Sequence, residues 1–142
     1  KNNIKLNGVK NVMPVQIALG NDIGQGIIQS KGSWSSLLSS GNQFAGQSVT
    51  IVPGDYFVER KQLPIPKVIK VDVEGYEYYV VKGLQKILND SACRMICCEI
   101  HPKLLPSSLK PQTIIEFLKS SSFKRMQRYS SYGENFHLIC YK

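Results

Sequence analysis

The stretch KVIKVDVEGYEYYVVKGLQKIL, residues 67–88, decides the fold. Its first part is almost continuously apolar and β-branched, which is typical of a parallel strand covered on both faces, so we predict a strand over Lys67–Val73. Beyond the Asp-x-Glu-Gly turn the apolar residues change to helical spacing, which predicts an amphipathic helix from Tyr76 to Leu88. The change of period places Asp72 and Glu74 near the carboxyl end of the strand. In open α/β sheets this is the edge where ligands bind.

The rest of the chain continues the alternation of strands and helices. The region from residue 21 to residue 47 is rich in Gly and Ser, and we expect short strands and loops there. A helix that begins with a proline and a hairpin around a Ser-Ser-Tyr-Gly-Glu turn follow near the end. The predicted strands are Val12–Leu19, Ser48–Val52, Arg94–Ile100, Lys124–Tyr129 and Asn135–Tyr141, and the predicted helical segments are Tyr56–Gln62 and Pro111–Ser120.

Length and composition describe an ordinary globular domain. The chain has 142 residues, of which 42% are hydrophobic and 20% are charged, so it can bury a core and we expect a single domain over residues 1–142. No run approaches the roughly 20 apolar residues that span a bilayer, and no membrane span is expected. The net charge is +8, with a denser basic group near residues 119–128. No RNA- or DNA-binding motif accompanies that group, so we interpret it as a solvated basic face and do not expect a nucleic-acid partner.

The four cysteines are Cys93, Cys97, Cys98 and Cys140. They show neither a Cys-x-x-Cys pair nor the Cys/His spacing of a zinc site. We therefore expect buried, reduced thiols that pack as small hydrophobic side chains. Reduced thiols favour a cytoplasmic location.

Several runs of the sequence, in order, resemble the FkbM family of methyltransferases. The resemblance implies a Rossmann-like class I methyltransferase fold, with a mostly parallel sheet that ends in an antiparallel hairpin. It also implies S-adenosylmethionine as cofactor and O-methylation of a hydroxyl on a sugar, glycan or other small metabolite. The runs that carry it are Asn7–Val12, Ile17–Gly20, Ile69–Glu77, Gly83-Leu84 and Cys98–Pro102.

The resemblance also implies that part of the domain is missing. Family members usually begin with a strand that ends in a glycine-rich turn, followed by a strand that ends in an acidic residue, and neither is found here. We therefore expect an N-terminally truncated catalytic domain without its first two strands, inactive by itself. In the family these strands lie between the two that correspond to Val12–Leu19 and Lys67–Val73. Either further polypeptide supplies them, or the chain closes its sheet by pairing those two strands directly.

The predicted catalytic residues are Asp72, Glu99 and His101. Asp72 stands where the resemblance places a residue that faces the methyl donor and the acceptor, although it could instead cap the following helix. Glu99 and His101 end the next strand, and a histidine close to two carboxylates could act as a general base. The same three groups could hold a divalent cation. We assign no metal ligand from the sequence.

Cofactor and substrate residues follow from the resemblance and from their positions. The end of the first strand is where the family lays the adenine of the cofactor, and Glu74 and the Gly/Ser-rich region could line the acceptor pocket. Glu77, in the first turn of a helix, is interpreted as a surface charge, and His137 as a structural residue. The predicted cofactor-binding residues are Ala18, Leu19, Gly20 and Asn21, and the predicted substrate residues are Glu74, Trp34 and Ser35.

Two other functions stay open at this point. Asp72-x-Glu74 could be the metal-binding pair of a nucleotide-sugar glycosyltransferase. Alternatively, the chain could be a non-catalytic α/β module that binds an anionic partner through its basic face.

Overall fold

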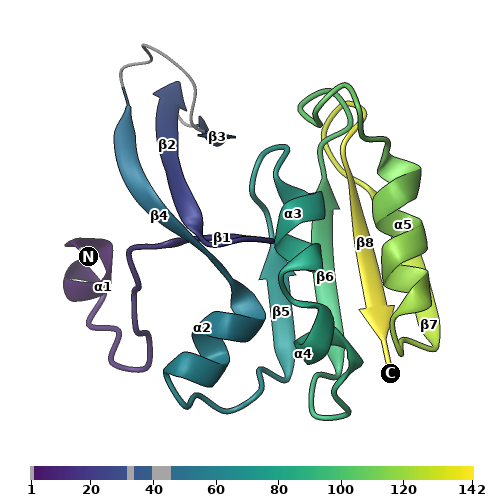
Figure 1. Ribbon diagram of the computed structural model, residues 1–142, viewed down its shortest axis with the longest axis horizontal. Coiled ribbons are helices and arrows are strands. Elements are labelled where there is room, and N and C mark those ends of the chain that lie inside the picture. Colours follow the sequence, from purple (N-terminus) through teal and green to yellow (C-terminus); the bar gives the residue numbers. More distant parts are fainter. Residues whose placement is uncertain (1, 32–33, 40–45) are drawn as a thin grey trace.

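The computed structural model describes residues 2–31, 34–39 and 46–142, and for residues 2, 30, 31 and 34–39 it describes the backbone alone. The strands form two four-stranded sheets that lie side by side (Figure 1). In chain order the elements are α1 (Asn2–Leu6), β1 (Ala18–Gly20), β2 (Gly24–Lys31), β3 (Trp34–Ser39), β4 (Gln47–Pro53), α2 (Gly54–Arg60), β5 (Val68–Val71), α3 (Glu77–Lys82), α4 (Gln85–Asn89), β6 (Met95–Ile100), α5 (Pro111–Ser120), β7 (Arg125–Ser130) and β8 (Phe136–Tyr141).

Both sheets are mixed, so the expectation of one mostly parallel sheet is wrong. The first has the order β1-β4-β2-β3 and the second the order β5-β6-β8-β7. Each contains one parallel pair, β1 with β4 and β5 with β6, and the remaining pairs are antiparallel. The predicted C-terminal hairpin is confirmed as β7 and β8. The α/β character of the fold is therefore confirmed, but not its predicted pairing.

Strand β1 differs most from its prediction. It covers only Ala18–Gly20, whereas a strand was expected from residue 12, and Val12, Met13 and Val15 are exposed. Its partner is β4, with Ala18 opposite Ile51. The two strands that were expected to pair directly, β1 and β5, belong to different sheets. Direct closure of the sheet is therefore wrong for the part of the chain that the structure describes.

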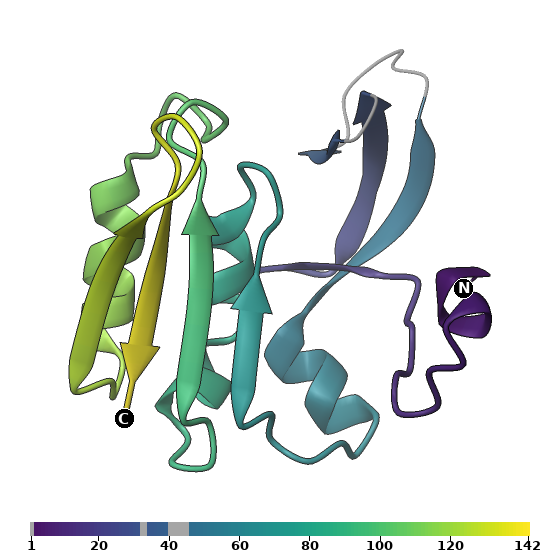
Figure 2. The ribbon, with the colours of Figure 1, turned by 180° about the vertical axis from the view of Figure 1, so that it is seen from behind.

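The main core belongs to the second sheet. Helices α3, α4 and α5 lie against one face of this sheet. Figure 2 shows the sheet from its other face, with the helices behind the strands. On β6 and β8, alternate residues are buried, because successive side chains of a strand point to opposite faces. The largest buried side chains of this core include Leu88, Ile96, Ile100, Ile114 and Leu118.

The helix predicted after the acidic turn is divided into α3 and α4 at Gly83. In a continuous helix the amide of Ile87 would donate to the carbonyl of Gly83, but it donates to Oδ1 of Asp55 instead, at 3.0 Å. The amide of Lys86 donates to the other Asp55 oxygen, and the carbonyl of Gly83 accepts from the amide of Asp55, both at 2.8 Å. The Asp55 carboxylate thus caps α4 and joins it to α2.

Gly83 also lets the helix layer approach the first sheet. A Cβ atom at this position would lie 1.8 Å from the carbonyl oxygen of Gly20, so no other residue fits without moving backbone. This close contact brings α3 against the end of β1.

Candidate functional site

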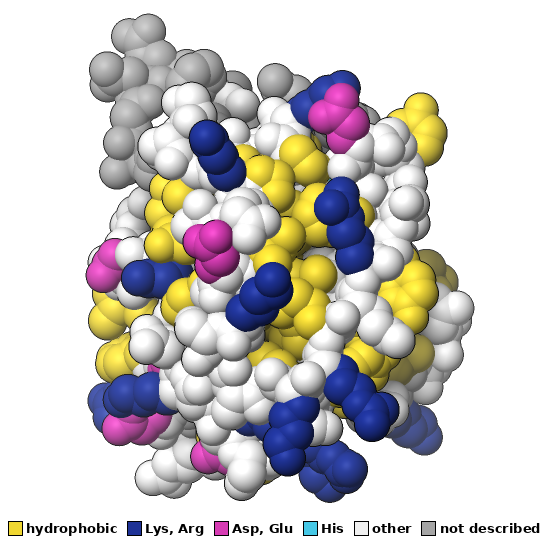
Figure 3. All heavy atoms as spheres, turned by 90° about the vertical axis from the view of Figure 1, so that its right-hand side faces the viewer, with side chains coloured by type: hydrophobic (Ala, Val, Ile, Leu, Met, Phe, Trp, Pro, Cys, Tyr) yellow, Lys and Arg dark blue, Asp and Glu magenta, His cyan; other side chains and the backbone are white. Residues whose placement is uncertain are grey.

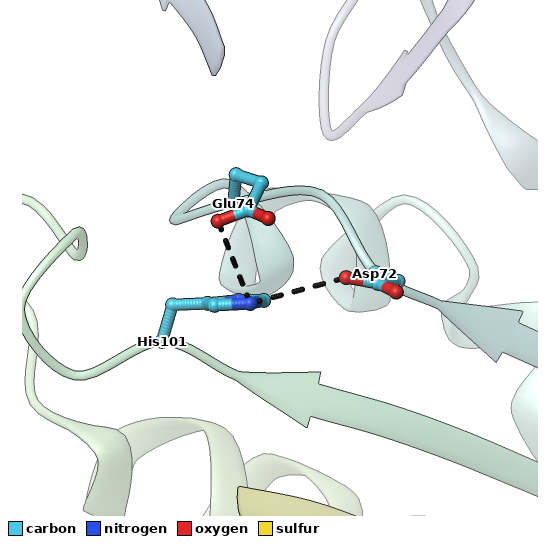
Figure 4. A group of neighbouring side chains, drawn as sticks. All are labelled: Asp72, Glu74 and His101. Carbon is cyan, nitrogen blue, oxygen red and sulfur yellow. Dashed lines mark ion pairs between the residues drawn. The ribbon is translucent and has the colours of Figure 1, made fainter. Parts of the chain in front are cut away.

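The site lies where β5 and β6 end, at their carboxyl edge (Figure 4). Asp72 follows β5 directly and His101 follows β6 directly, and the strands are parallel neighbours with Val71 opposite Cys98. The parallel register therefore brings residues 29 positions apart in the chain to one place. Figure 4 shows Asp72 and Glu74 turned toward the same end of the His101 ring.

The His101 ring is fixed from behind by Glu77. His101 is 3% exposed and Glu77 is fully buried, and Nδ1 of the histidine lies 2.6 Å from Oε1 of the glutamate. The same carboxylate oxygen accepts a hydrogen bond from the amide of Gly75 at 2.9 Å. The interpretation of Glu77 as a surface charge is therefore wrong. It shares the inner stripe of the helix with Val80, Val81 and Leu84, at the i, i+3, i+4 and i+7 positions, and this spacing was the signal that could have revealed its burial.

The other ring nitrogen of His101 faces carboxylates. Nε2 lies 3.5 Å from Oε2 of Glu74, 3.9 Å from Oδ1 of Asp72 and 4.0 Å from Oε1 of Glu99. These separations exceed the 2.7–3.2 Å typical of an N–H···O hydrogen bond. The ring thus presents Nε2 to three oxygen atoms without a close bond to any of them.

A tight turn places Glu74 over the ring. Glu74 has φ of 51° and Gly75 has φ of 101°, both in the left-handed region. A Cβ on Gly75 would lie 2.3 Å from the carbonyl oxygen of Leu104, in the loop after His101, so glycine is required there. The turn is therefore shaped by the same loop that carries the histidine.

Glu99 is engaged with several donors at the edge of the cluster. Ser131 Oγ donates to it at 2.9 Å, His137 Nε2 lies 3.1 Å away and Lys70 Nζ lies 3.4 Å away. Burial alone would raise the pKa of Glu99, but the Ser131 hydrogen bond and the neighbouring charges of His137 and Lys70 lower it below its ordinary value. Glu99 is thus held as a carboxylate.

Lys70 connects the two strand ends. Its Nζ lies 3.2 Å from Oδ2 of Asp72 as well as 3.4 Å from Glu99. Partial burial lowers the pKa of Lys70, but the hydrogen bond to Asp72 and the nearby negative charges outweigh it and raise this pKa. The N-cap residue of α3 is Tyr76, and the hydrogen bond of the Asp72 carboxylate is to Lys70, so the alternative role of Asp72 as a helix cap is not seen in the structure.

A largely apolar pocket of about 540 Å³ opens beside Asp72. It lies between β1 and β5, with further lining from α2 and α3, and includes Ala18, Leu19, Val68, Val73 and Tyr76. Two of the predicted cofactor residues, Ala18 and Leu19, therefore share a pocket with Asp72.

Of the other predicted cofactor residues, Gly20 and Asn21 do not line this pocket. Gly20 is packed beneath Gly83, and the Asn21 side chain bonds to Asp22. Trp34 and Ser35 lie in β3, opposite Lys31 and Ser30, and their side chains lie outside the described residues.

The basic residues of one face are separated from one another. Figure 3 shows Lys and Arg side chains dispersed around apolar ones on the face that carries α5 and β7. Within the described ranges, no helix has the length and apolar character needed to cross a membrane.

Comparison with known proteins bears on the family of the chain. The family model described as the methyltransferase FkbM domain matches residues 2–129. The chain is also 36% identical over 62 residues to the hexuronic acid methyltransferase AglP of Haloferax volcanii. That match covers 44% of the chain but 25% of the relative, so the chain spans about a quarter of the curated protein it matches. No solved structure matches the chain. The match over most of its length shows that the chain belongs to the FkbM family of methyltransferases.

Proposed function

We propose that this chain is part of an S-adenosylmethionine-dependent O-methyltransferase that acts on a hydroxyl of a sugar or another small metabolite. The family assignment favours methyl transfer over the glycosyltransferase and binding-module alternatives. Similarity to a methyltransferase named for hexuronic acid supports a sugar-like acceptor. The observation that carries the proposal is the buried His101 ring, held by Glu77, with Nε2 turned toward Asp72 and Glu74.

The cluster suits the recognition of an acceptor hydroxyl. A hydroxyl can donate to a carboxylate while its own oxygen accepts a bond, and Asp72 and Glu74 are both partly exposed at the site. Methyl transfer to oxygen also requires that the hydroxyl proton be removed, and carboxylates and imidazole are the groups that accept protons near neutral pH. We assign Asp72 and His101 to the group of side chains that holds the acceptor hydroxyl. Glu99, engaged with Ser131, His137 and Lys70, contributes negative charge.

The pocket fits part of the cofactor. Its volume lies within the 300–1,000 Å³ typical of small-molecule sites, and the apolar wall at Ala18, Leu19 and Tyr76 suits a flat adenine base. S-Adenosylmethionine would supply an electrophilic methyl group. The residues of this chain would position the acceptor beside it, and positioning accounts for much of the acceleration in such reactions.

We further propose that two strands are missing between β1 and β5. The pocket separates these strands, and Val68 on β5 is 57% exposed, which is unusual for an inner strand of an α/β sheet. Isothermal titration tests this part of the proposal. We expect weak or no binding of S-adenosylmethionine by the 142-residue chain, and tighter binding once the residues encoded before Lys1 are included. Tight binding of S-adenosylmethionine by the 142-residue chain would contradict the proposal of missing strands. It would not contradict the proposal of methyl transfer.

The activity itself is tested on the extended polypeptide with a panel of hydroxyl acceptors, beginning with uronic acid glycosides. Transfer is followed by mass spectrometry as a gain of one methyl group. Asp72→Asn should reduce turnover by orders of magnitude without lowering thermal stability. Glu116→Gln, on the exposed side of α5, is the matched control and should leave turnover unchanged. Turnover near the wild-type rate in Asp72→Asn would remove Asp72 from the mechanism.

A further inference from the structure

We propose that Asp72, Glu74 and His101 together bind one divalent metal ion. Each offers one ligand atom, and the three atoms lie within 4.8 Å of one another (Figure 4). This inference rests on the proposed function, because the ion would act on the acceptor hydroxyl that is to be methylated. The binding itself can be measured without methyl transfer.

The distances are close to those of a coordination shell. Ligand atoms that are about 2.0–2.2 Å from a metal ion lie about 3.0–3.5 Å from one another. Nε2 of His101 is 3.5 Å from Oε2 of Glu74 and 3.9 Å from Oδ1 of Asp72. Lys70 bonds to the other Asp72 oxygen, Oδ2, so Oδ1 remains directed at the histidine. The two carboxylates lie farther apart, within 4.8 Å of each other, so a bound ion would draw Asp72 and Glu74 together by up to about 1 Å.

The buried histidine is the second observation that points to a cation. It is 3% exposed, and its Nδ1 forms a short hydrogen bond with the buried carboxylate of Glu77. When Nδ1 carries the proton of a neutral ring, Nε2 presents a lone pair, and this lone pair faces the oxygen atoms of Glu74 and Asp72. A lone pair that faces two carboxylates is unfavourable unless a positive charge, either a bound ion or a proton on Nε2, lies between them.

The Glu77–His101 pair is also the arrangement found behind metal ligands. A ligating histidine usually donates its other ring N–H to a carboxylate, which fixes the tautomer and the orientation of the ring. Glu77 occupies this position and is itself anchored by the amide of Gly75. Because Glu77 is fully buried, its carboxylate contacts the His101 ring and not solvent.

The ligand set indicates the class of metal. Two carboxylate oxygens and one imidazole nitrogen suit Mn²⁺ or Zn²⁺ better than Mg²⁺ or Ca²⁺, because the latter two prefer oxygen ligands alone. The two carboxylates would neutralise the ion. Three protein ligands leave at least one coordination position for a water molecule or an acceptor hydroxyl, and a hydroxyl bound to such an ion loses its proton more readily.

Titration of the 142-residue chain with MnCl₂ and with ZnCl₂ tests the site. We expect saturable binding of one ion per chain by isothermal calorimetry. Asp72→Asn and Glu74→Gln should each weaken it at least tenfold, while the control Glu116→Gln should bind as the wild type does. Absence of saturable binding, or equal binding by the two variants and the wild type, would overturn the proposal.

A second measurement requires no variant. The chain has two histidines, His101 and His137. In a ¹⁵N spectrum of histidine-labelled protein, Zn²⁺ should shift the Nε2 resonance of His101, while His137, paired with Glu99, serves as the internal reference. A response of His137 alone, or of neither ring, would contradict the site.

The two proposals can fail separately. If the extended polypeptide transfers methyl groups at full rate in EDTA and the chain binds no ion, the metal site is wrong and the proposed function stands. If the ion binds as expected but no hydroxyl acceptor is methylated, the metal site stands and the proposed function is wrong.

Discussion

Nδ1 of His101 and Oε1 of Glu77 lie 2.6 Å apart, and both side chains are buried. The pair joins the loop after β6 to the first turn of α3. Because Glu77 also accepts a hydrogen bond from the amide of Gly75, one carboxylate fixes both the histidine and the acidic turn that carries Glu74.

Glu77→Gln is therefore expected to destabilise the protein. The amide keeps an acceptor oxygen for the Gly75 N–H and for His101 but loses the negative charge that strengthens both bonds, and a buried hydrogen bond to a charged group is worth about 1.5–3 kcal/mol. We expect the free energy of unfolding in urea to fall by about 1–3 kcal/mol. Glu116→Gln, the same substitution on an exposed helix face, should change it by less than about 0.5 kcal/mol. Equal stability of the two variants would show that Glu77 does not hold the turn.

Gly83→Ala should lower the stability of the fold strongly, although it adds only one methyl group. The added Cβ would meet the carbonyl oxygen of Gly20 at 1.8 Å, and backbone on both sides must move to relieve it. Overpacking of this kind costs about 1–3 kcal/mol or more. Gly24→Ala is the control, because a Cβ there meets nothing within 4 Å. Thermal unfolding should separate the two variants by several degrees, and an unchanged midpoint for Gly83→Ala would contradict the contact.

Asp55→Ala tests the cap that joins α2 to α4. The variant leaves the amides of Lys86 and Ile87 without their carboxylate acceptor. Loss of a cap costs about 0.5–2 kcal/mol, and we expect that decrease in the free energy of unfolding. Glu59→Ala removes an exposed carboxylate from the same helix and should have little effect. If both variants lose the same stability, the loss comes from helix charge and not from the cap.

Alkaline pH should weaken the fold through its buried thiols. Burial, and then the nearby Cys97, raise the pKa of Cys140 from 9.0 to about 12. The folded thiol therefore keeps its proton at a pH where the unfolded thiol loses it, so its contribution to stability is complete below pH 9 and is lost as the pH rises toward 12. Urea denaturation between these limits should show a falling free energy of unfolding. Cys140→Ala should make that fall shallower, and an unchanged slope would contradict the shifted pKa.

The thiols also offer a comparison within the native chain. Cys93, Cys98 and Cys140 are buried, whereas Cys97 is half-buried, and all four are free. Brief alkylation at pH 8 should therefore label Cys97 first, as mapped by peptide mass spectrometry. Earlier labelling of Cys140 would mean that the core around β8 opens readily.

The elements that sequence reasoning located well are those whose pattern is local. The period change at residues 72–76, the proline that begins α5 and the glycine turn between β7 and β8 each act within a few residues. Strand pairing is not local. β1 pairs with β4, about 30 residues away, and a strand of three residues does not specify that partner.

The candidate site was predictable in part for the same reason. Asp72 and His101 follow two strands whose parallel pairing could be expected, so their convergence was expected as well. Glu77 was missed because the rule that places acidic residues at helix starts describes exposed helices. Its neighbours Val80, Val81 and Leu84 are all buried, and they mark the face on which it lies.

The side-by-side arrangement of the two sheets has a consequence for motion. The main buried cluster is drawn from β5, β6, β8 and their helices, whereas the first sheet is joined to it chiefly where α3 meets β1 and α2 meets α4. Segments with few buried contacts open at a lower free energy than the core does. Backbone amides of β2 and β4 should therefore take up deuterium sooner than those of β6 and β8. Any molecule that fills the space between the sheets should slow the deuterium uptake of β2 and β4.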